Sequence, residues 1–167
     1  NQLIEDGDWG ELDYFLIDMP PGTSDIHLTL VQTLGITGVV IVSTPQEVAL
    51  ADARRGIAMF TGEKVNVPVL GIVENMAWFT PEPHPDERYY IFGNGGAQRL
   101  AEELNVELLA QIPLVAAVGE HSDAGEPIAL GDTMSARAFV HLAHNVIDAV
   151  NRRNETLPPT IKVELKK

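Results

Sequence analysis

The sequence predicts an α/β fold in which a doubly wound, mainly parallel sheet is covered by helices on both faces. Three observations support this fold class. Four short segments are continuously apolar and rich in β-branched residues, which is typical of strands buried on both faces of a parallel sheet. Segments with helical periodicity lie between and after them. The joins are short, so strand and helix alternate as crossover units.

The predicted strands share an uninterrupted apolar character. They are Tyr14–Asp18 (YFLID), Gly38–Ser43 (GVVIVS), Val67–Glu74 (VPVLGIVE) and Leu108–Ile112 (LLAQI). In an open sheet of this kind, ligands bind just beyond the carboxyl ends of the strands. Candidate functional residues are therefore sought directly after each strand.

The predicted helices follow the strands along the chain. They are Asp25–Leu34, Gln46–Phe60, Ala97–Leu104 and Ser135–Val150. The second has the strongest start signal. Thr44 is expected as its N-cap, Pro45 at the first helical position and Glu47 at the third, which would form a capping box.

Pro158, Pro159 and three lysines follow the last predicted helix. This composition predicts an extended C-terminal tail over residues 154–167, and residues 1–153 then form one domain portion. A length of 167 residues suits a single domain.

Composition excludes several classes of function. The chain has no cysteine, so disulfide bonds and thiolate ligands are excluded and a cytoplasmic location is expected. A net charge of −13 opposes contact with nucleic acids and anionic membranes, so neither is expected as a partner. No signal peptide opens the sequence, and no apolar run approaches the roughly 18 residues of a membrane span.

The segment Asp18–Asp25 (DMPPGTSD) is the most informative candidate site. If Asp18 ends a buried strand, its carboxylate emerges at the carboxyl edge of the sheet, where such groups hold Mg²⁺ through water. Gly22 would let the backbone approach a phosphate closely. The alternative is a strand-end aspartate followed by a stiff Pro-Pro turn and a capped helix, and the residues alone leave both open.

Two further candidates follow the last two predicted strands. The Asn75 amide offers a donor and an acceptor, which suits the edge of an adenine ring, although asparagine also forms plain turns. Pro113 and Leu114 could wall a base, although proline is also common loop punctuation.

Two phosphate-binding signatures are missing. The chain contains no Gly-Lys pair, so the G-x-x-x-x-G-K-[ST] loop that grips the β- and γ-phosphates is absent from it. The segment Phe92–Ala97 (FGNGGA) fails the dinucleotide-binding fingerprint, because Gln98 stands where the third glycine belongs. A flexible helix entry is the better interpretation of that segment.

Taken in order, five segments resemble motifs of the Mrp/ApbC-type ATP-binding proteins. They are Asp18–Asp25 (DMPPGTSD), Ser43–Gly56 (STPQEVALADARRG), Gly71–Phe79 (GIVENMAWF), Ile91–Leu104 (IFGNGGAQRLAEEL) and Ile112–Ile128. These proteins belong to the deviant Walker A branch of P-loop NTPases, together with the MinD and ParA ATPases and nitrogenase iron protein. The resemblance implies a partial P-loop NTPase fold and an ATP- and Mg²⁺-dependent scaffold or carrier for iron–sulfur cluster assembly. It also implies a homodimer that serves an iron–sulfur apoprotein client.

The resemblance assigns roles residue by residue. Asp18 matches the switch aspartate near Mg²⁺, and Gly22 matches the glycine that senses the γ-phosphate. Asn75 matches the asparagine that contacts adenine, while Pro113 and Leu114 fall in the loop beside the base. Residues 45–52 match a segment near the dimer face of related ATPases.

The sequence departs from the family pattern in two places. The lysine loop of the family lies upstream of the matched region, so the chain corresponds to a C-terminal portion, and we expect it to be inactive alone although the full-length family member hydrolyses ATP. In the insert Thr80–Tyr90, the positions of the family's Cys-x-x-Cys hold Pro81 and His84. Proline cannot ligate iron, so cluster binding in the usual manner is not expected.

Two other functions remain open. The chain could be an interaction or regulatory protein that keeps the NTPase fold without its chemistry, because the cysteines and the lysine loop are missing. A nicotinamide-dependent oxidoreductase rests on fold analogy alone.

Overall fold

The computed structural model describes residues 6–23, 25–81, 84 and 86–162. Ser24, residues 82–83 and 85 of the insert, and residues 163–167 of the predicted tail lie outside the described residues. The elements in chain order are α2 (Asp25–Thr33), β1 (Val39–Ser43), α3 (Glu47–Thr61), β2 (Val69–Glu74), α4 (Gly96–Leu104), β3 (Leu108–Gln111), α5 (Ala116–Asp123), the short 3₁₀ helix η1 (Ile128–Leu130) and α6 (Met134–Thr156).

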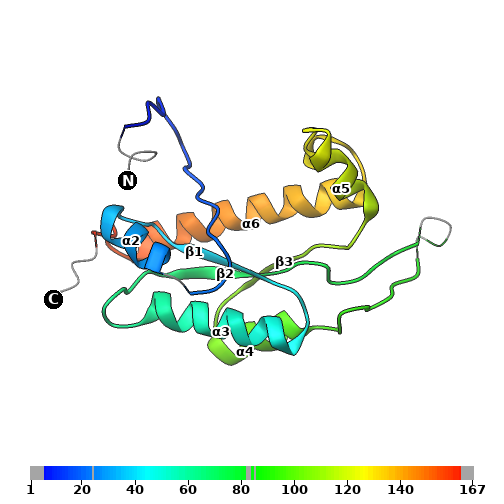
Figure 1. The fold of residues 1–167 in the computed structure, drawn as a ribbon, viewed down its shortest axis with the longest axis horizontal. Coiled ribbons are helices and arrows are strands. Elements are labelled where there is room, and N and C mark those ends of the chain that lie inside the picture. The colour runs from blue at the N-terminus through cyan, green and yellow to red at the C-terminus, as the bar shows by residue number, and fades with distance from the viewer. Residues whose placement is uncertain (1–5, 24, 82–83, 85, 163–167) are drawn as a thin grey trace.

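The sheet has the strand order β1-β2-β3, and both pairs of neighbours are parallel. Helix α6 covers one face, and α3 and α4 cover the other (Figure 1). The α/β class with a parallel sheet and helices on both faces is therefore confirmed. Three of the predicted strands are confirmed as β1, β2 and β3.

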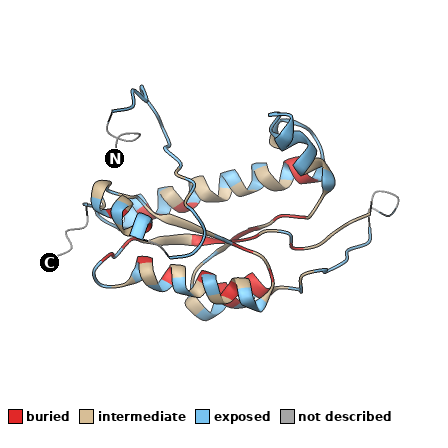
Figure 2. Cartoon of the chain, in the orientation of Figure 1, coloured by how far each residue is buried: buried red, intermediate tan, exposed pale blue. Residues whose placement is uncertain are grey.

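A separate hydrophobic cluster fills each side of the sheet. Between the sheet and α3 and α4, Leu50, Ile72 and Leu100 are buried together. Between the sheet and α6, Val73, Leu109 and Ala149 are buried together. Because β2 contributes to both clusters, its last four residues are all buried, and Figure 2 shows buried residues concentrated on the strands and on the helix faces that meet them.

The strand predicted over residues 14–18 is wrong. These residues form an extended segment without strand pairing, and the large apolar side chains of Tyr14, Phe15 and Leu16 are exposed (dark blue in Figure 1). A strand needs a neighbour for its backbone N–H and C=O groups. Within the described residues β1 pairs only with β2, so its other edge is open, and residues 14–18 do not fill it.

Several predicted boundaries also change. Helix α3 begins at Glu47 with Gln46 as its N-cap, and Gln46 makes no side-chain capping bond. The capping box with Thr44 is therefore wrong, since the Thr44 hydroxyl donates to Gln46 Oε1 at 3.0 Å instead of accepting from the helix. Helix α6 continues to Thr156, and α5 and η1 occupy a region expected to be a loop.

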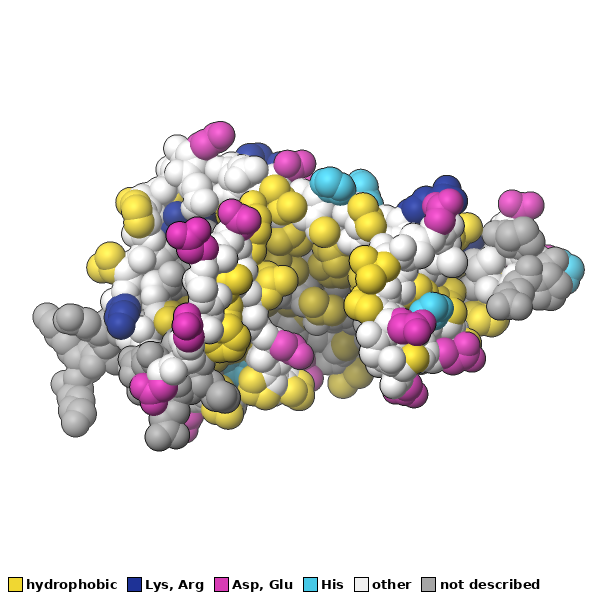
Figure 3. Space-filling model, turned by 90° about the horizontal axis from the view of Figure 1, so that it is seen from above, with side chains coloured by type: hydrophobic (Ala, Val, Ile, Leu, Met, Phe, Trp, Pro, Cys, Tyr) yellow, Lys and Arg dark blue, Asp and Glu magenta, His cyan; other side chains and the backbone are white. Residues whose placement is uncertain are grey.

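Many large apolar side chains of the molecule are exposed. Apolar side chains gather in the hollow at the middle of the face seen in Figure 3. Exposed large hydrophobic residues include Trp9, Leu12, Ile26, Val42 and Val140. Contiguous exposed apolar patches mark interaction surfaces or ligand-binding grooves. None of the described helices combines the length and apolarity needed to cross a membrane.

We expect Leu100→Ala to lower the free energy of unfolding by about 2–5 kcal/mol, because it leaves a cavity in a packed cluster. The side chain of Leu100 is 0% exposed. The matched control is Leu16→Ala, since Leu16 is 84% exposed and loses almost no packing. Urea unfolding followed by circular dichroism measures both changes. Equal destabilisation by the two substitutions would contradict this packing.

Candidate functional site

The ends of the three strands meet at the carboxyl edge of the sheet, and backbone hydrogen bonds extend the sheet beyond its last residues. The Asn75 N–H donates to the Ser43 carbonyl at 2.7 Å, which holds the end of β2 against β1. On the other side, the Ile112 N–H donates to the Glu74 carbonyl at 2.8 Å, and the Ala77 N–H donates to the Ile112 carbonyl at 2.9 Å. The loops after β2 and β3 are therefore fixed side by side.

Asn75 is half-buried at this edge. Its side-chain Oδ1 accepts a hydrogen bond from the Met76 N–H at 3.0 Å, and Met76 has a left-handed backbone with φ of 53°. This local bond sets the direction of the Asn75 side chain, whose NH₂ group supplies two donors. A side chain held in this way can read the acceptor atoms of a flat heterocycle.

Pro113 and Leu114 lie next to the segment that follows Asn75. Pro113 is buried, and the half-buried Leu114 donates its N–H to the Trp78 carbonyl at 2.8 Å. Phe79 bridges to Leu114 in parallel and to Tyr89 in antiparallel orientation. The structure thus brings together Asn75, Pro113 and Leu114, three of the residues singled out from the sequence.

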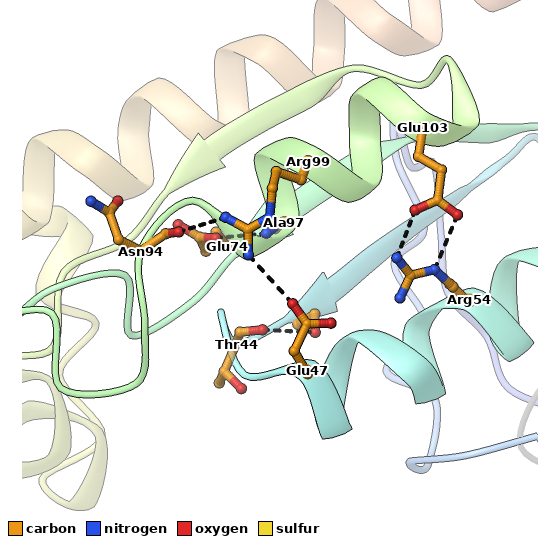
Figure 4. Close-up of polar contacts among 9 residues, drawn as sticks. Thr44, Glu47, Arg54, Glu74, Asn94, Ala97, Arg99 and Glu103 are labelled. Atoms are coloured by element: carbon orange, nitrogen blue, oxygen red, sulfur yellow. Dashed lines mark hydrogen bonds and ion pairs between the residues drawn. The ribbon is translucent and has the colours of Figure 1, made fainter.

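Glu74 is a buried carboxylate at the centre of this edge, and the sequence analysis missed its role. Its side chain is 0% exposed. Oε2 accepts from the Ala97 N–H at 2.7 Å (Figure 4), and Oε1 accepts from Gln111 Nε2, also at 2.7 Å. Helix α4 has no side-chain cap of its own, so a carboxylate from the neighbouring strand satisfies its first turn and interacts favourably with the helix dipole. The available signal was a glutamate that ends an otherwise apolar strand.

The entry to α4 packs directly on the entry to α3. A Cβ at Gly96 would lie 2.3 Å from the Pro45 carbonyl oxygen, so only glycine permits this approach. Arg99 donates to the Asn94 carbonyl at 2.9 Å and to Glu47 Oε1 at 3.4 Å (Figure 4). The Ala97 N–H at this helix start binds a carboxylate, not a phosphate.

An exposed ion pair joins α3 to α4 farther along. Arg54 Nη2 lies 2.6 Å from Glu103 Oε2. This hydrogen bond lowers the pKa of Glu103 below its usual range, and the same contact raises the pKa of Arg54. Because water screens both groups, the pair adds little to stability.

Asp18 and Gly22 lie apart from this edge. Both are exposed, and Gly22 has a left-handed φ of 86°. Met19 packs against a cluster that includes Phe60, Val65 and Val67, just before β2 begins. This places the segment near the amino ends of the strands, so the expected emergence of Asp18 at the carboxyl edge is not observed. The Mg²⁺ role of Asp18 and the phosphate role of Gly22 stay predictions.

A metal-binding cluster and a surface pocket are two further places where a site could lie. Among the described residues, no group of three or more His, Asp or Glu side chains is placed to hold a metal ion. An open pocket of about 500 Å³ lies between α5, η1 and the start of α6, lined by His121, Glu126, Ile128 and Thr133 among others.

We expect Glu74→Ala to destabilise the protein by about 1–3 kcal/mol, because the buried Ala97 N–H and the Gln111 amide each lose their acceptor. Glu103→Ala is the control, because it removes an exposed carboxylate from α4, the helix that Glu74 contacts. We expect it to change the stability little. Chemical unfolding followed by circular dichroism measures both. A Glu103→Ala effect as large as that of Glu74→Ala would show that the buried bonds carry no special weight.

Sequence comparison finds relatives across most of the chain. The family model described as "ParA: NUBPL iron-transfer P-loop NTPase" matches residues 1–147. An iron-sulfur protein required for NADH dehydrogenase from Arabidopsis thaliana is 45% identical over 160 residues, which is 95% of this chain and 50% of that protein. An iron-sulfur cluster carrier protein from Synechocystis is 45% identical over 152 residues, 90% of this chain and 42% of that protein. The chain thus spans about half the length of the curated relatives it matches.

Solved structures agree with the fold. A nucleotide-binding protein from Archaeoglobus fulgidus, solved in complex with ADP, matches with a TM-score of 0.62 and 47% identity, covering 70% of this chain and 47% of that one. The cell division ATPase MinD from Pyrococcus furiosus matches with a TM-score of 0.59 over 81% of this chain and 52% of that one, and its 24% identity supports the fold alone. The motif-based resemblance is confirmed: the chain belongs to the NUBPL-type family of iron-transfer P-loop NTPases.

Proposed function

We propose that this chain is part of an ATP-binding scaffold or carrier for iron–sulfur cluster assembly and that it supplies the edge that contacts the nucleotide base. The supporting observation is the fixed neighbourhood of Asn75, Pro113 and Leu114 at the carboxyl edge of the sheet. Family membership and the ADP complex of the Archaeoglobus fulgidus relative point in the same direction.

The chemistry of this edge suits a purine. The Asn75 amide can donate to a ring nitrogen and can accept from an exocyclic amino group through its second lone pair. The half-buried Leu114 offers apolar surface against the flat face of a base, and the buried Pro113 precedes it in the chain. Main-chain bonds rather than flexible side chains set the position of this segment. A base held there meets a largely preformed site.

The residues of this chain do not fit the phosphates and Mg²⁺ in the same way. The 167 residues contain no Gly-Lys pair, so the lysine that grips the β- and γ-phosphates has to come from elsewhere. Asp18 and Gly22 are exposed and lie away from Asn75. No catalytic step is therefore assigned to them in this arrangement.

The open edge of β1 offers a physical reason for this difference. Residues 14–18 form an extended segment in which Tyr14, Phe15 and Leu16 are exposed, and among the described residues β1 pairs only with β2, so its other edge is open. We infer that residues 14–18 take their expected strand position, and Asp18 reaches the nucleotide's metal, only when further polypeptide completes the sheet. The greater length of the relatives provides such polypeptide.

The cargo cluster would need ligands from outside this chain, which has no cysteine. Where the family pattern places a cysteine pair, the chain has Pro81 and His84, and His84 Nδ1 lies 3.7 Å from Glu87 Oε1. A homodimer and an apoprotein client remain parts of the proposal because the resemblance implies them, and a cytoplasmic location remains part of it because the chain has no cysteine.

A second candidate function is a non-catalytic interaction protein. The observation that favours it is the large exposed apolar surface combined with the missing lysine loop and cysteines. The two functions differ in whether the longer protein binds ATP, and isothermal calorimetry decides between them.

We expect this chain alone to hydrolyse no ATP in the presence of Mg²⁺, because the lysine loop that holds the transferred phosphate is absent from it. A phosphate-release assay measures the rate, and the same assay on the protein extended to the length of its relatives is the positive control. Robust turnover by this chain would refute the requirement for that loop.

We expect Asn75→Ala in the extended protein to weaken ATP binding by about tenfold, the effect of losing one or two hydrogen bonds to the base. Asn94→Ala is the matched control, since Asn94 is exposed and its backbone carbonyl, not its side chain, accepts from Arg99. Calorimetric titration with ATP measures both affinities. Identical ATP affinities of the two variants would show that Asn75 does not contact the base. If the unsubstituted extended protein binds no ATP, the second candidate function, a non-catalytic interaction protein, is favoured.

A further inference from the structure

A buried arginine lies near the end of α6. Arg153 is 8% exposed and follows Ala149 by one helical turn, so it lies on the helix face that packs on the sheet. None of the ion pairs among the described residues includes it. A buried guanidinium of this kind needs other acceptors.

Those acceptors come from the segment just after the helix. Arg153 Nη2 donates to the Pro158 carbonyl and to Thr160 Oγ1, each at 2.7 Å, and Nη1 donates to Asn154 Oδ1 at 3.2 Å. The Leu157 N–H donates back to the Arg153 carbonyl at 2.9 Å. The positive group also sits at the helix C-terminus, where the helix dipole favours it. Residues 157–160, called the strap below, are thus fastened by one side chain.

The strap crosses the loop between α2 and β1. A Cβ built on Gly35 in that loop would lie 2.6 Å from the Thr160 carbonyl oxygen, so the two backbones are in close contact. On its inner side, α2 is held by Val31, which is buried with Phe60, Val65 and Val67. The strap therefore presses on the loop that joins α2 to the sheet.

We propose that the strap is a conformational device: Arg153 fastens it over the α2–β1 loop, and it thereby restrains the opening of α2. Its release would let α2 open more often while the sheet and its two clusters stay intact. The coupling rests on contacts at the amino edge of the sheet, so it stands whether or not Asn75 contacts a nucleotide.

Hydrogen exchange of the intact 167-residue chain tests the proposal, with mass spectrometry on peptides from residues 25–38. Thr160→Val removes one acceptor of Arg153 at nearly constant volume, and we expect exchange in these peptides to become about tenfold faster, as for a lost bond to a charged donor. Peptides from α4 should not change. Arg152→Gln is the matched control, because the neighbouring Arg152 is exposed and pairs with Glu107 instead.

A double-mutant cycle tests whether Thr160→Val acts through the contact between the strap and the α2–β1 loop or only within the strap itself. A Cβ on Gly35 is incompatible with the present position of the Thr160 carbonyl oxygen, so in a Gly35→Ala background we expect this contact to be broken and Thr160→Val to add little. In a Gly56→Ala background it should keep its full effect, because a Cβ on Gly56 meets nothing within 4 Å. Unchanged exchange of residues 25–38 in Thr160→Val, or equal effects in the two backgrounds, would overturn the proposal.

Discussion

The carboxyl edge depends on one buried carboxylate. Glu74 ends the central strand, and its two oxygens accept from the first turn of α4 and from a side chain of β3. A charged group at 0% exposure is tolerable only when such donors replace water. Because Glu74 is held in this way, the next residue, Asn75, leaves the sheet in a fixed direction. The direction in which Asn75 leaves the sheet is thus set by the hydrogen bonds of its neighbour Glu74.

The second constraint is an incomplete sheet. β1 has one neighbour among the described residues, and a five-residue apolar segment that has the composition of a strand lies exposed nearby. An exposed segment of this kind and an open edge are each unfavourable in water, and each is relieved by the same event, the addition of a strand. Figure 3 shows, in addition, apolar side chains gathered in a hollow on one face of the molecule.

The elements that the sequence predicted correctly are those whose apolar pattern follows from their burial in the fold. β2 was recognisable as a continuously apolar run buried on both faces, and β1 and β3 share the apolar run although Val42 of β1 is exposed. Helices α3 and α4 were recognisable because their apolar residues recur with helical spacing. The same signal failed for residues 14–18, since it records which side chains favour burial and not whether a neighbouring strand is present. Glu74 was missed because its partner Ala97 lies 23 residues away, and α5 because none of its residues is buried.

The tryptophan fluorescence of the protein depends in part on the arm, the segment that begins at Phe79 and ends at Tyr89, two residues that pair with each other. The chain has two tryptophans, and they report on separate regions. Trp78, at the base of the arm, has the Arg88 guanidinium stacked 4.2 Å from its ring centroid, and such a cation perturbs indole emission. Trp9 precedes the exposed segment, is 50% exposed and lies 5.0 Å from the Phe15 ring. Intrinsic fluorescence can therefore report on the N-terminal segment through Trp9 and on the surroundings of Arg88 through Trp78 without any added label.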